Sequence, residues 1–296
     1  MNALDRLSPH LEDERVTDIL FDSSIKGWVE IDGKLIETQN PFENEQDLQA
    51  WVKNILSSGG ARLDIAKPLS EVTLRTDFGL IRLHCVLAGE CSQRTHLSIR
   101  RHKAKQLSLT ELLQDSQVGM EQQLRQIIND KQNFVIIGGT GAGKTTLLKA
   151  LLNEVKGERI ITIEDSPELD LSGHCVALLA RPSNQEGVGE ISQAMLLREA
   201  LRMRPDRLVI GEARGSELLV LLQALNTGHS GSGFTLHANS SKAAVPRMLA
   251  ILSGAGVNTE LARILLASSI QWVVEVQKIE KKRVVLSIEK LALNDL

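Results

Sequence analysis

The chain has 296 residues and is poor in aromatic side chains, with no tyrosine, five phenylalanines and three tryptophans. Its formal net charge is only −3, because basic and acidic side chains nearly balance. Proteins that hold nucleic acid chiefly through charge and base stacking need a basic surface and stacking aromatics. The composition therefore argues against nucleic acid as the main partner.

Cysteine is also scarce: Cys85, Cys91 and Cys175 form no Cys-x-x-Cys pair. An odd number of separated cysteines predicts reduced thiols and argues against a structural zinc site. No apolar run reaches the 18 residues that favour a membrane-spanning helix, and the N-terminus has no apolar signal-peptide core. We expect a cytoplasmic chain that reaches a membrane only through protein partners.

The first third of the chain has patterns typical of a small α+β domain. Apolar residues alternate within 15–37, where Asp32-Gly33 predicts a two-residue hairpin turn. Residues 44–58 carry an apolar stripe at helical spacing, and residues 72–87 alternate again. These patterns predict strands, a helix and further strands in that order.

A second domain begins near a capping-box pattern, Ser108 to Glu111, which predicts a helix start. We place the boundary just before it, giving domains 1–106 and 107–296. From Asn133 onward strands alternate with helices, which predicts a parallel-type sheet. The expected strands are 134–137, 159–163, 175–179, 207–210 and 233–236, the expected helices are 145–155, 192–203, 216–227, 242–252 and 259–268, and a hairpin is expected over 272–291.

Residues 138–145 read GGTGAGKT, between an apolar run and a helix-like stretch, which is the P-loop pattern. Glycines let backbone N–H groups converge on phosphate oxygens, and the following helix N-terminus attracts anions. Lys144 is placed to reach the β- and γ-phosphates, and the Thr145 hydroxyl to bind Mg²⁺. The pattern predicts ATP and Mg²⁺ as ligands. The expected nucleotide-binding residues of the loop are Gly138, Thr140, Gly141, Ala142, Gly143, Lys144, Thr145 and Thr146.

Acidic residues and histidines follow three other expected strands, and ligands of open α/β sheets bind at the carboxyl ends of strands. An apolar strand that ends in a carboxylate is typical of the acid that activates water in P-loop enzymes. Taken alone, each group is equally typical of a solvated turn or a glycine-rich loop. The candidates are Glu164 and Glu168 after 159–163, Glu212 after 207–210, and His229 and His237 around 233–236.

Four motifs in order resemble those of the type II/type IV secretion ATPase family, the traffic ATPases: GGTGAGKTT, TIEDSPEL, LRMRPDRLVIGEARGSE and NTGHSGSGFTLHANS. The family includes conjugation and effector-secretion ATPases and the motors of type IV and tight-adherence (Flp) pili. The resemblance is close over 110–252, and it is nearest to the CpaF-type pilus and conjugation branches. It implies an α/β fold, a RecA-like P-loop core with a smaller N-terminal α+β (PAS-like) domain.

The resemblance also implies roles for the candidates. Glu164 and Glu168 belong to an aspartate box that positions Mg²⁺ and water, and Glu212 is the acid of an atypical Walker B motif. His229 and His237 flank a histidine box, with His237 nearer the γ-phosphate. The implied Mg²⁺ ligands are Thr145, Glu164 and Glu212.

Members of the family work as rings of six, in which arginines of the N-terminal domain or of a neighbour complete the site. The resemblance makes Arg82, Arg94, Arg100 and Arg101 candidates for this role. The segment 94–105 holds five Lys or Arg residues and no acid, a composition equally typical of a solvated linker.

The leading hypothesis is a hexameric ATPase that powers pilus assembly or protein secretion at the inner membrane, with platform proteins there as partners. Two alternatives remain open. One is a DNA-translocating motor with a RecA fold, and the other is an assembly scaffold that binds nucleotide with little turnover.

Overall fold

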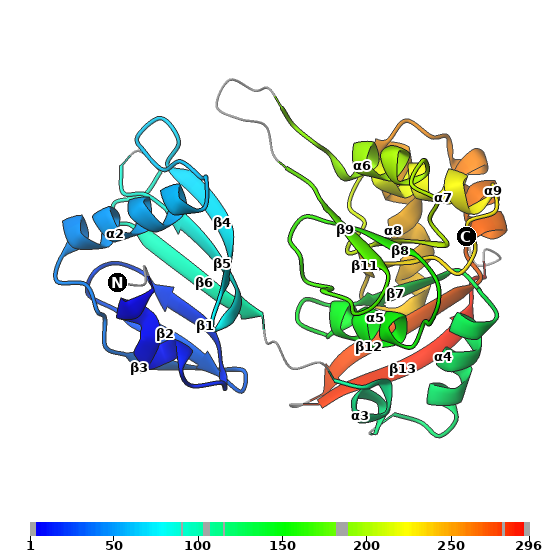
Figure 1. Cartoon of the computed structure of the whole chain (residues 1–296), viewed down its shortest axis with the longest axis horizontal. Helices are drawn as coiled ribbons and strands as arrows, with labels where there is room; N and C mark the ends of the chain where they lie inside the picture. Colours follow the sequence, from blue (N-terminus) through cyan, green and yellow to red (C-terminus); the bar gives the residue numbers. More distant parts are fainter. Residues whose placement is uncertain are drawn as a thin grey trace. The chain divides into compact units, whose positions relative to one another are not determined.

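The computed structural model describes residues 4–89, 91–102, 107–114, 116–181, 189–279 and 282–292. The chain divides into two compact units, residues 1–105 and 106–296, and each is described by itself (Figure 1). The domain boundary expected between 106 and 107 adjoins residues 103–106, which lie outside the described residues.

Unit 1 is a six-stranded antiparallel sheet in the order β3-β2-β1-β6-β5-β4, with helix α2 across one face (Figure 1). Buried side chains of the sheet, such as Ile19, Leu83 and Ile99, form one core with Leu48 and Val52 of α2. Its elements are η1 (Asp5–Leu7), α1 (Ser8–Leu11), β1 (Val16–Phe21), β2 (Gly27–Ile31), β3 (Lys34–Thr38), α2 (Glu45–Ser58), β4 (Leu69–Thr76), β5 (Gly79–Val86) and β6 (His96–His102).

The predicted hairpin turn at Asp32 and Gly33 is confirmed: both residues have positive φ and join β2 to β3. Strand β6 was not expected, because its segment read as a basic linker. The linker interpretation is wrong for residues 96–102, which form a strand between β1 and β5, while 103–105 lie outside the described part. Leu97 and Ile99 face the core and the basic residue Arg100 faces outward.

Unit 2 contains a seven-stranded sheet in the order β13-β12-β7-β11-β10-β8-β9. The strands from β12 to β9 pair in parallel, and β13 pairs antiparallel with β12. Its elements are α3 (Leu109–Leu113), α4 (Met120–Asn129), β7 (Phe134–Gly138), α5 (Lys144–Asn153), β8 (Ile160–Glu164), β9 (Cys175–Leu179), α6 (Gln193–Ala200), β10 (Arg207–Ile210), α7 (Glu217–Leu225), β11 (Gly233–His237), α8 (Ser241–Gly254), α9 (Thr259–Ser269), β12 (Trp272–Ile279) and β13 (Lys282–Lys290).

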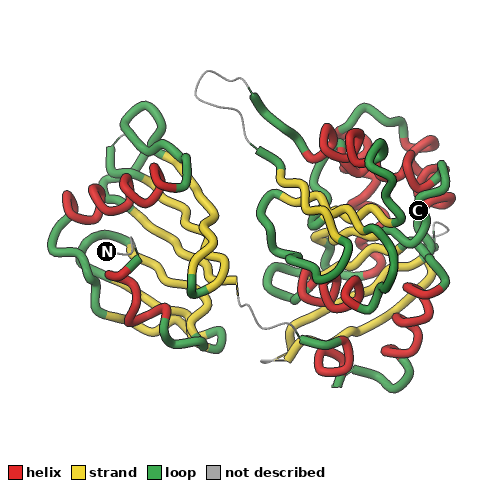
Figure 2. Tube along the Cα trace, viewed as in Figure 1, coloured by secondary structure: helices red, strands yellow, loops and turns green. Residues whose placement is uncertain are grey.

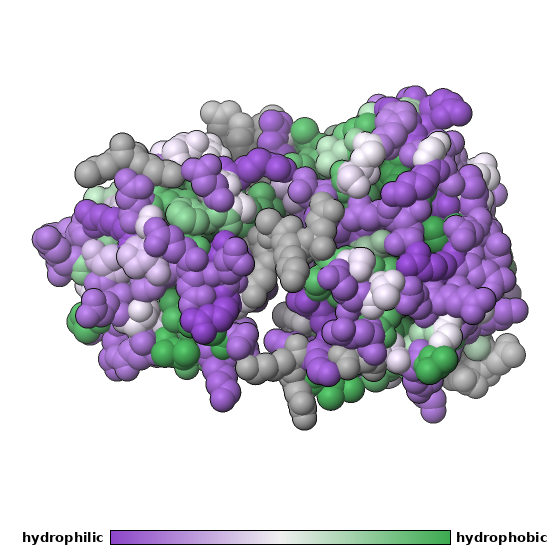
Figure 3. Space-filling view, turned by 60° about the horizontal axis from the view of Figure 1, so that its bottom comes forward, coloured by the Kyte–Doolittle hydropathy of each residue, from purple (hydrophilic) through white to green (hydrophobic). Residues whose placement is uncertain are grey.

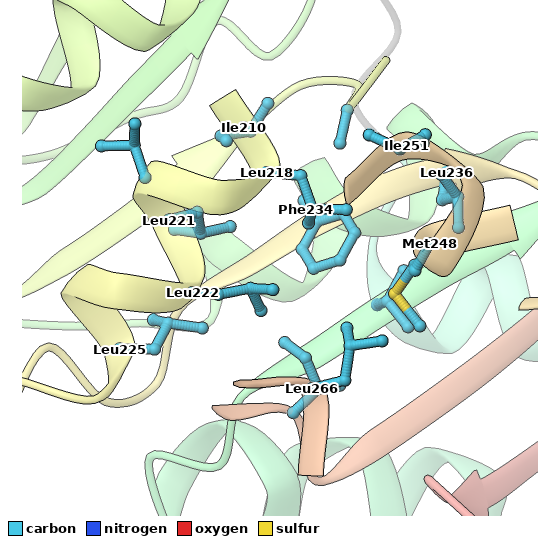
Figure 4. Close-up of a cluster of buried hydrophobic side chains, with 14 of the residues drawn as sticks. Ile210, Leu218, Leu221, Leu222, Leu225, Phe234, Leu236, Met248, Ile251 and Leu266 are labelled. Carbon is cyan, nitrogen blue, oxygen red and sulfur yellow. The ribbon is translucent and has the colours of Figure 1, made fainter. Parts of the chain in front are cut away.

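Helices cover both faces of this sheet (Figure 2). On β7, Val135 and Ile137 pack into the core beneath α6 to α9, whereas Phe134 and Ile136 pack into the core beneath α3 to α5. The first core is shown in Figure 4, where Phe234 of β11 lies among leucines of α7. Double burial explains why these strands are continuous apolar runs without alternation. The predicted α/β class, a RecA-like core with a smaller α+β domain, is confirmed.

Among the described residues, no helix is both long and apolar enough to cross a bilayer. In the face shown in Figure 3, hydrophilic residues predominate on each unit, and smaller hydrophobic areas are scattered among them.

Candidate nucleotide-binding site

The predicted P-loop connects β7 to α5 and requires its glycines. Gly138, Gly141 and Gly143 have φ of 154°, 71° and 98°, values that side chains with a Cβ rarely adopt. A Cβ at Gly138 would lie 2.2 Å from the carbonyl oxygen of Val276, and one at Gly143 would lie 2.4 Å from Cδ of Arg283. A Cβ at Gly141 would meet no described atom within 4 Å, so the loop is open on that side. The loop is therefore a backbone cradle that fits a polyphosphate.

Lys144 begins α5 and folds back over this loop. Its Nζ donates to the carbonyl oxygens of Gly138 at 3.0 Å and Gly139 at 2.9 Å, and the residue is only 7% exposed. Burial lowers the pKa of the ammonium group, an effect that the carboxylate of Glu212 opposes. The lysine thus lies at the cradle, with donors that can transfer from carbonyl to phosphate oxygens.

The sheet register brings His237 to the same place. Strand β11 pairs in parallel with β7, so that His237 lies opposite Gly138 across 99 residues of sequence. His237 Nε2 lies 3.0 Å from Oε1 of Glu212, and Nδ1 lies 3.4 Å from Nζ of Lys144. Burial and the Lys144 charge lower the pKa of His237, which favours a neutral imidazole between the lysine and the carboxylate. Lys144, His237 and Glu212 therefore form one cluster.

Arg214 joins this cluster, although the sequence analysis gave it no role. Its guanidinium donates to Oε2 of Glu212 and lies 3.5 Å from Oδ2 of Asp165, at the end of β8. Asp165 accepts a further hydrogen bond from Gln193 at the start of α6, at 2.8 Å. Arg214 lies two residues after Glu212 in the same sequence motif, so the sequence could have indicated it. Its contact with Asp165, just after β8, depends on the fold.

Glu164 lies at the carboxyl end of β8 and is 3% exposed. It accepts a hydrogen bond from the backbone N–H of Leu169 at 3.0 Å. Burial raises the pKa of Glu164 to about 7, and the nearby charge of Glu168 acts in the same direction. A Cβ at Gly211 would lie 3.0 Å from Cγ of Glu164, which is close for van der Waals contact. Gly211 stands where a strict Walker B motif has aspartate, and its lack of a side chain leaves room for Glu164 from the neighbouring strand.

Mg²⁺ would need more than these side chains. Within the described ranges, no group of three His, Cys, Asp or Glu residues is arranged to hold a metal ion alone. Protein Mg²⁺ sites next to nucleotides use one or two protein ligands together with phosphate oxygens and water. Thr145 in the first turn of α5 and the carboxylate of Glu212 fit that donor set.

His229 lies elsewhere. His229 precedes β11, whereas the P-loop follows the carboxyl end of β7. Because β7 and β11 run in parallel, the two lie at opposite ends of these strands. Its Nδ1 lies 3.2 Å from the carbonyl oxygen of Ala224 near the end of α7. Within unit 2, the structure groups His237 with the P-loop and leaves His229 apart.

The four candidate arginines belong to unit 1. Arg82 and Arg100 lie opposite each other on β5 and β6, and they pair with Glu71 and Asp18 respectively. Arg101 donates to the backbone carbonyls of three residues of unit 1: Leu11, Asp13 and Phe78. Arg94 is exposed. Whether any of them acts at the nucleotide stays a prediction.

Comparisons with known proteins agree with this geometry. The profile of the family described as type II/IV secretion system protein matches residues 74–285. A Mycobacterium tuberculosis (strain CDC 1551) protein, provisionally named a conjugal transfer protein, is 37% identical over 280 residues, covering 92% of this chain and 79% of the relative. VirB11 of the Bartonella henselae type IV secretion system is 27% identical over 330 residues, covering 95% and 90%.

Solved structures share the fold. The VirB11 ATPase of Brucella suis in complex with sulphate superposes with a TM-score of 0.51 at 24% identity, covering 98% of this chain and 96% of that one. The Legionella pneumophila ATPase DotB gives 0.69 at 21% identity and covers 99% and 81%. The pilus retraction motor PilT with bound ADP gives 0.67 at 21% identity and covers 98% and 82%. The chain belongs to the type II/IV secretion system protein family, and it is an ATPase.

Proposed function

We propose that this chain is the ATP-driven motor of a secretion or pilus-assembly machine and that it works as a homo-hexamer. The observation that carries the proposal is the cluster of Lys144, His237 and Glu212 beside the P-loop. It unites a phosphate-binding cation, a γ-phosphate sensor and an acid at the carboxyl edge of parallel strands, where open α/β sheets bind ligands.

In this function the triphosphate lies in the loop 138–145. Lys144 exchanges its contacts with the Gly138 and Gly139 carbonyls for the β- and γ-phosphate oxygens. Thr145 and Glu212 would hold Mg²⁺, with Glu164 beside them, and a bound Mg²⁺ would supply positive charge that offsets the charge of the phosphates. The remaining residues of the loop, Thr140, Ala142 and Thr146, border the same phosphates.

Glu164 receives the proton of the attacking water. A general base is most efficient when its pKa lies near the working pH, and the raised pKa of Glu164, about 7, meets that condition. Burial is the main cause of this raised pKa, and the charge of Glu168 adds to it. His237, held by Glu212, responds when the γ-phosphate leaves.

The names of the relatives support the wider role. They include a type IV secretion system protein, a pilus retraction motor and a provisional conjugal transfer protein. We therefore infer work at the cytoplasmic side of an inner membrane, through platform proteins of a secretion system or a tight-adherence (Flp) pilus. The near-neutral, aromatic-poor composition disfavours the DNA-translocating alternative.

Two substitutions test the site. Lys144→Ala should lower nucleotide affinity more than tenfold, because the loop loses its phosphate-binding charge.

Glu212→Gln should retain nucleotide but lose on the order of 10²-fold or more in turnover, because a neutral amide cannot orient water and the metal shell. Binding of a fluorescent ATP analogue and phosphate release report the two effects. Lys156→Ala, which removes an exposed lysine whose ammonium donates to the Asn153 carbonyl, is the matched control.

Wild-type turnover in Lys144→Ala would refute the site. Lost affinity in Glu212→Gln, with normal turnover per bound nucleotide, would limit Glu212 to nucleotide binding and leave Glu164 alone to orient the attacking water. Stimulation of turnover by duplex DNA would support the DNA motor, and tight binding with negligible turnover in assembled rings would support the scaffold.

A further inference from the structure

Gln193 is the first residue of α6, and it is only 8% exposed. Its neighbours in the helix, Ala194 and Leu197, pack into the apolar core beneath α6 to α9. The side-chain amide donates from Nε2 to Oδ1 of Asp165, just after β8, at 2.8 Å. Its other end, Oε1, is buried and has no hydrogen-bond partner among the described residues. The amide is therefore satisfied only at the end that faces Asp165.

Packing does not explain a glutamine at this position. A buried carbonyl without a donor destabilises the folded state, and an apolar side chain of similar length, such as methionine, would fill the space without this cost. Reversing the amide would place Oε1 against the carboxylate of Asp165, so that carboxylate determines which end of the amide stays buried and unsatisfied. The contact with Asp165 is thus the gain that the glutamine provides.

Asp165 uses its second carboxylate oxygen to hold Arg214. Oδ2 lies 3.5 Å from a guanidinium nitrogen of Arg214, while Oδ1 is held by Gln193. The side chain of Asp165 is 49% exposed and that of Arg214 is 60% exposed, so burial fixes neither of them. The guanidinium also donates to Oε2 of Glu212, whose Oε1 lies 3.0 Å from Nε2 of His237. One series of contacts therefore runs from the start of α6 to the acid beside the P-loop.

We propose that Gln193 is a positioning residue for ATP hydrolysis, which holds Asp165 so that the Arg214 guanidinium stays against the acid beside the P-loop. The inference rests on the proposed function, in which Glu212 orients water and the metal shell. Half-exposed side chains change rotamer readily, and a displaced guanidinium would turn the carboxylate that it contacts. A buried amide on a packed helix is the fixed end of the series, as a precisely held site requires.

The experiment measures kcat and KM for ATP with Mg²⁺ on the full chain, in Gln193→Met, in Asp165→Ala and in the double variant. Gln193→Met should lower kcat about tenfold, as is typical when an outer supporting contact is lost, and should leave KM unchanged. Asp165→Ala should lower kcat at least as much, because Arg214 loses its partner. The double variant should be no slower than Asp165→Ala, since both changes break one series of contacts.

Gln126→Met is the matched control, because it makes the same replacement at an exposed glutamine of α4. It should leave kcat and KM unchanged.

Thermal unfolding separates positioning from a purely structural role. If Gln193 served only the fold, Gln193→Met would lower the melting temperature together with the activity. We expect the melting temperature to hold or to rise by roughly 2–4 °C, because the unsatisfied carbonyl has been removed. If the buried change prevents folding, Asp165→Ala tests the same contacts from a half-exposed position.

Three results would overturn the inference. They are an unchanged kcat in Gln193→Met or in Asp165→Ala, losses that multiply in the double variant, and a kcat loss accompanied by a lower melting temperature in Gln193→Met. The variants Lys144→Ala and Glu212→Gln keep the proposed function separate. If these two behave as expected while Gln193→Met turns over normally, only the inference fails. If these two leave turnover unchanged, the proposed function fails and the inference fails with it.

Discussion

Single residues explain how this P-loop enzyme departs from the strict motif. The end of β10 carries Gly211 where that motif has an aspartate, and the space so freed is filled by Glu164 from β8. The burial of Glu164 comes from its position at the end of a strand covered on both faces. A side chain at Gly211 would push directly on that carboxyl group. The unusual glycine and the unusual pKa of Glu164 therefore have one structural cause.

Glu164 predicts a pH-dependent stability. Its pKa is about 7 in the folded chain against an ordinary value near 4.5, so the folded state binds more protons between these values. Stability should therefore fall as pH rises from about 4.5 to about 7 and stay level above. At about 1.4 kcal/mol for each pH unit, the loss is about 3 kcal/mol. Glu164→Gln should abolish this dependence and be more stable than wild type at about pH 8.

Urea unfolding gives the measurement. With Trp28 and Trp51 replaced by phenylalanine, the fluorescence of Trp272 reports unit 2 alone. The difference between wild type and Glu164→Gln isolates this residue from Glu168 and Lys149, which carry charge nearby. A difference that does not vary with pH would show that Glu164 is ionised throughout.

The sequence predicted some site residues and missed others for a physical reason. Lys144 and Glu212 are fixed by local motifs, and both lie where the motifs indicate. Arg214 contacts Asp165 just after the distant strand β8, so its surroundings exist only after folding. His229 stays a prediction: the turn that holds it enters β11, so it lies at the other end of the parallel strands from the P-loop that leaves β7.

At the scale of elements, one buried ion pair connects several elements at the ends of the strands that lie opposite the P-loop. Arg207, at the start of β10, has a side chain only 2% exposed and makes two hydrogen bonds with the carboxylate of Glu158. It also donates to the carbonyl of Ile128 in α4 and to that of Gly231 before β11. Three connections of the core thus converge on one guanidinium.

Removing this guanidinium should cost far more than removing a surface one. Arg207→Met leaves Glu158 with the Lys131 ammonium alone and removes a buried donor from the Ile128 and Gly231 carbonyls, and breaking a buried ion pair costs about 3 kcal/mol or more. Arg202→Met removes an exposed pair with Glu199, whose expected contribution is about 0–1 kcal/mol. The free energy of unfolding, followed through Trp272 as above, should separate the two variants. Equal losses would show that the Arg207 cluster adds no more than a surface pair.

Elements with a strong local signal were predicted well. The turn at Asp32-Gly33, the capping box at Ser108, and the strands beside the P-loop are confirmed, because each depends on short-range geometry. Strand β6 was missed since its outward positions are basic, and alternation with charge resembles a linker. Helix α4 was missed although its apolar residues have helical spacing, because its N-cap is Gly119 in the left-handed region and no polar cap marks its start.

At the scale of the whole molecule, four arginines of unit 1 are the candidates for contact with a bound nucleotide. Arg101 is engaged with the backbone of its own unit, so its replacement should disturb that fold. Arg82 and Arg100 lie on the sheet face away from the core and pair with Glu71 and Asp18, and Arg94 is exposed. These three are free to meet a phosphate group without unfolding unit 1.

If one of these three arginines acts across a subunit boundary, activity requires rings. Specific ATPase activity should then rise with protein concentration as rings assemble, which sedimentation at the same concentrations can follow. Arg82→Ala, Arg94→Ala and Arg100→Ala are each mixed with Lys144→Ala. For the residue that acts in trans, the mixture should regain activity that neither variant has alone, because one boundary unites an intact arginine with an intact P-loop. An arginine finger contributes on the order of 10³-fold or more in rate, so the rescue should stand well above background. Activity that is flat on dilution, with no recovery in any mixture, would leave these arginines with their partners in unit 1 and the site complete within one subunit.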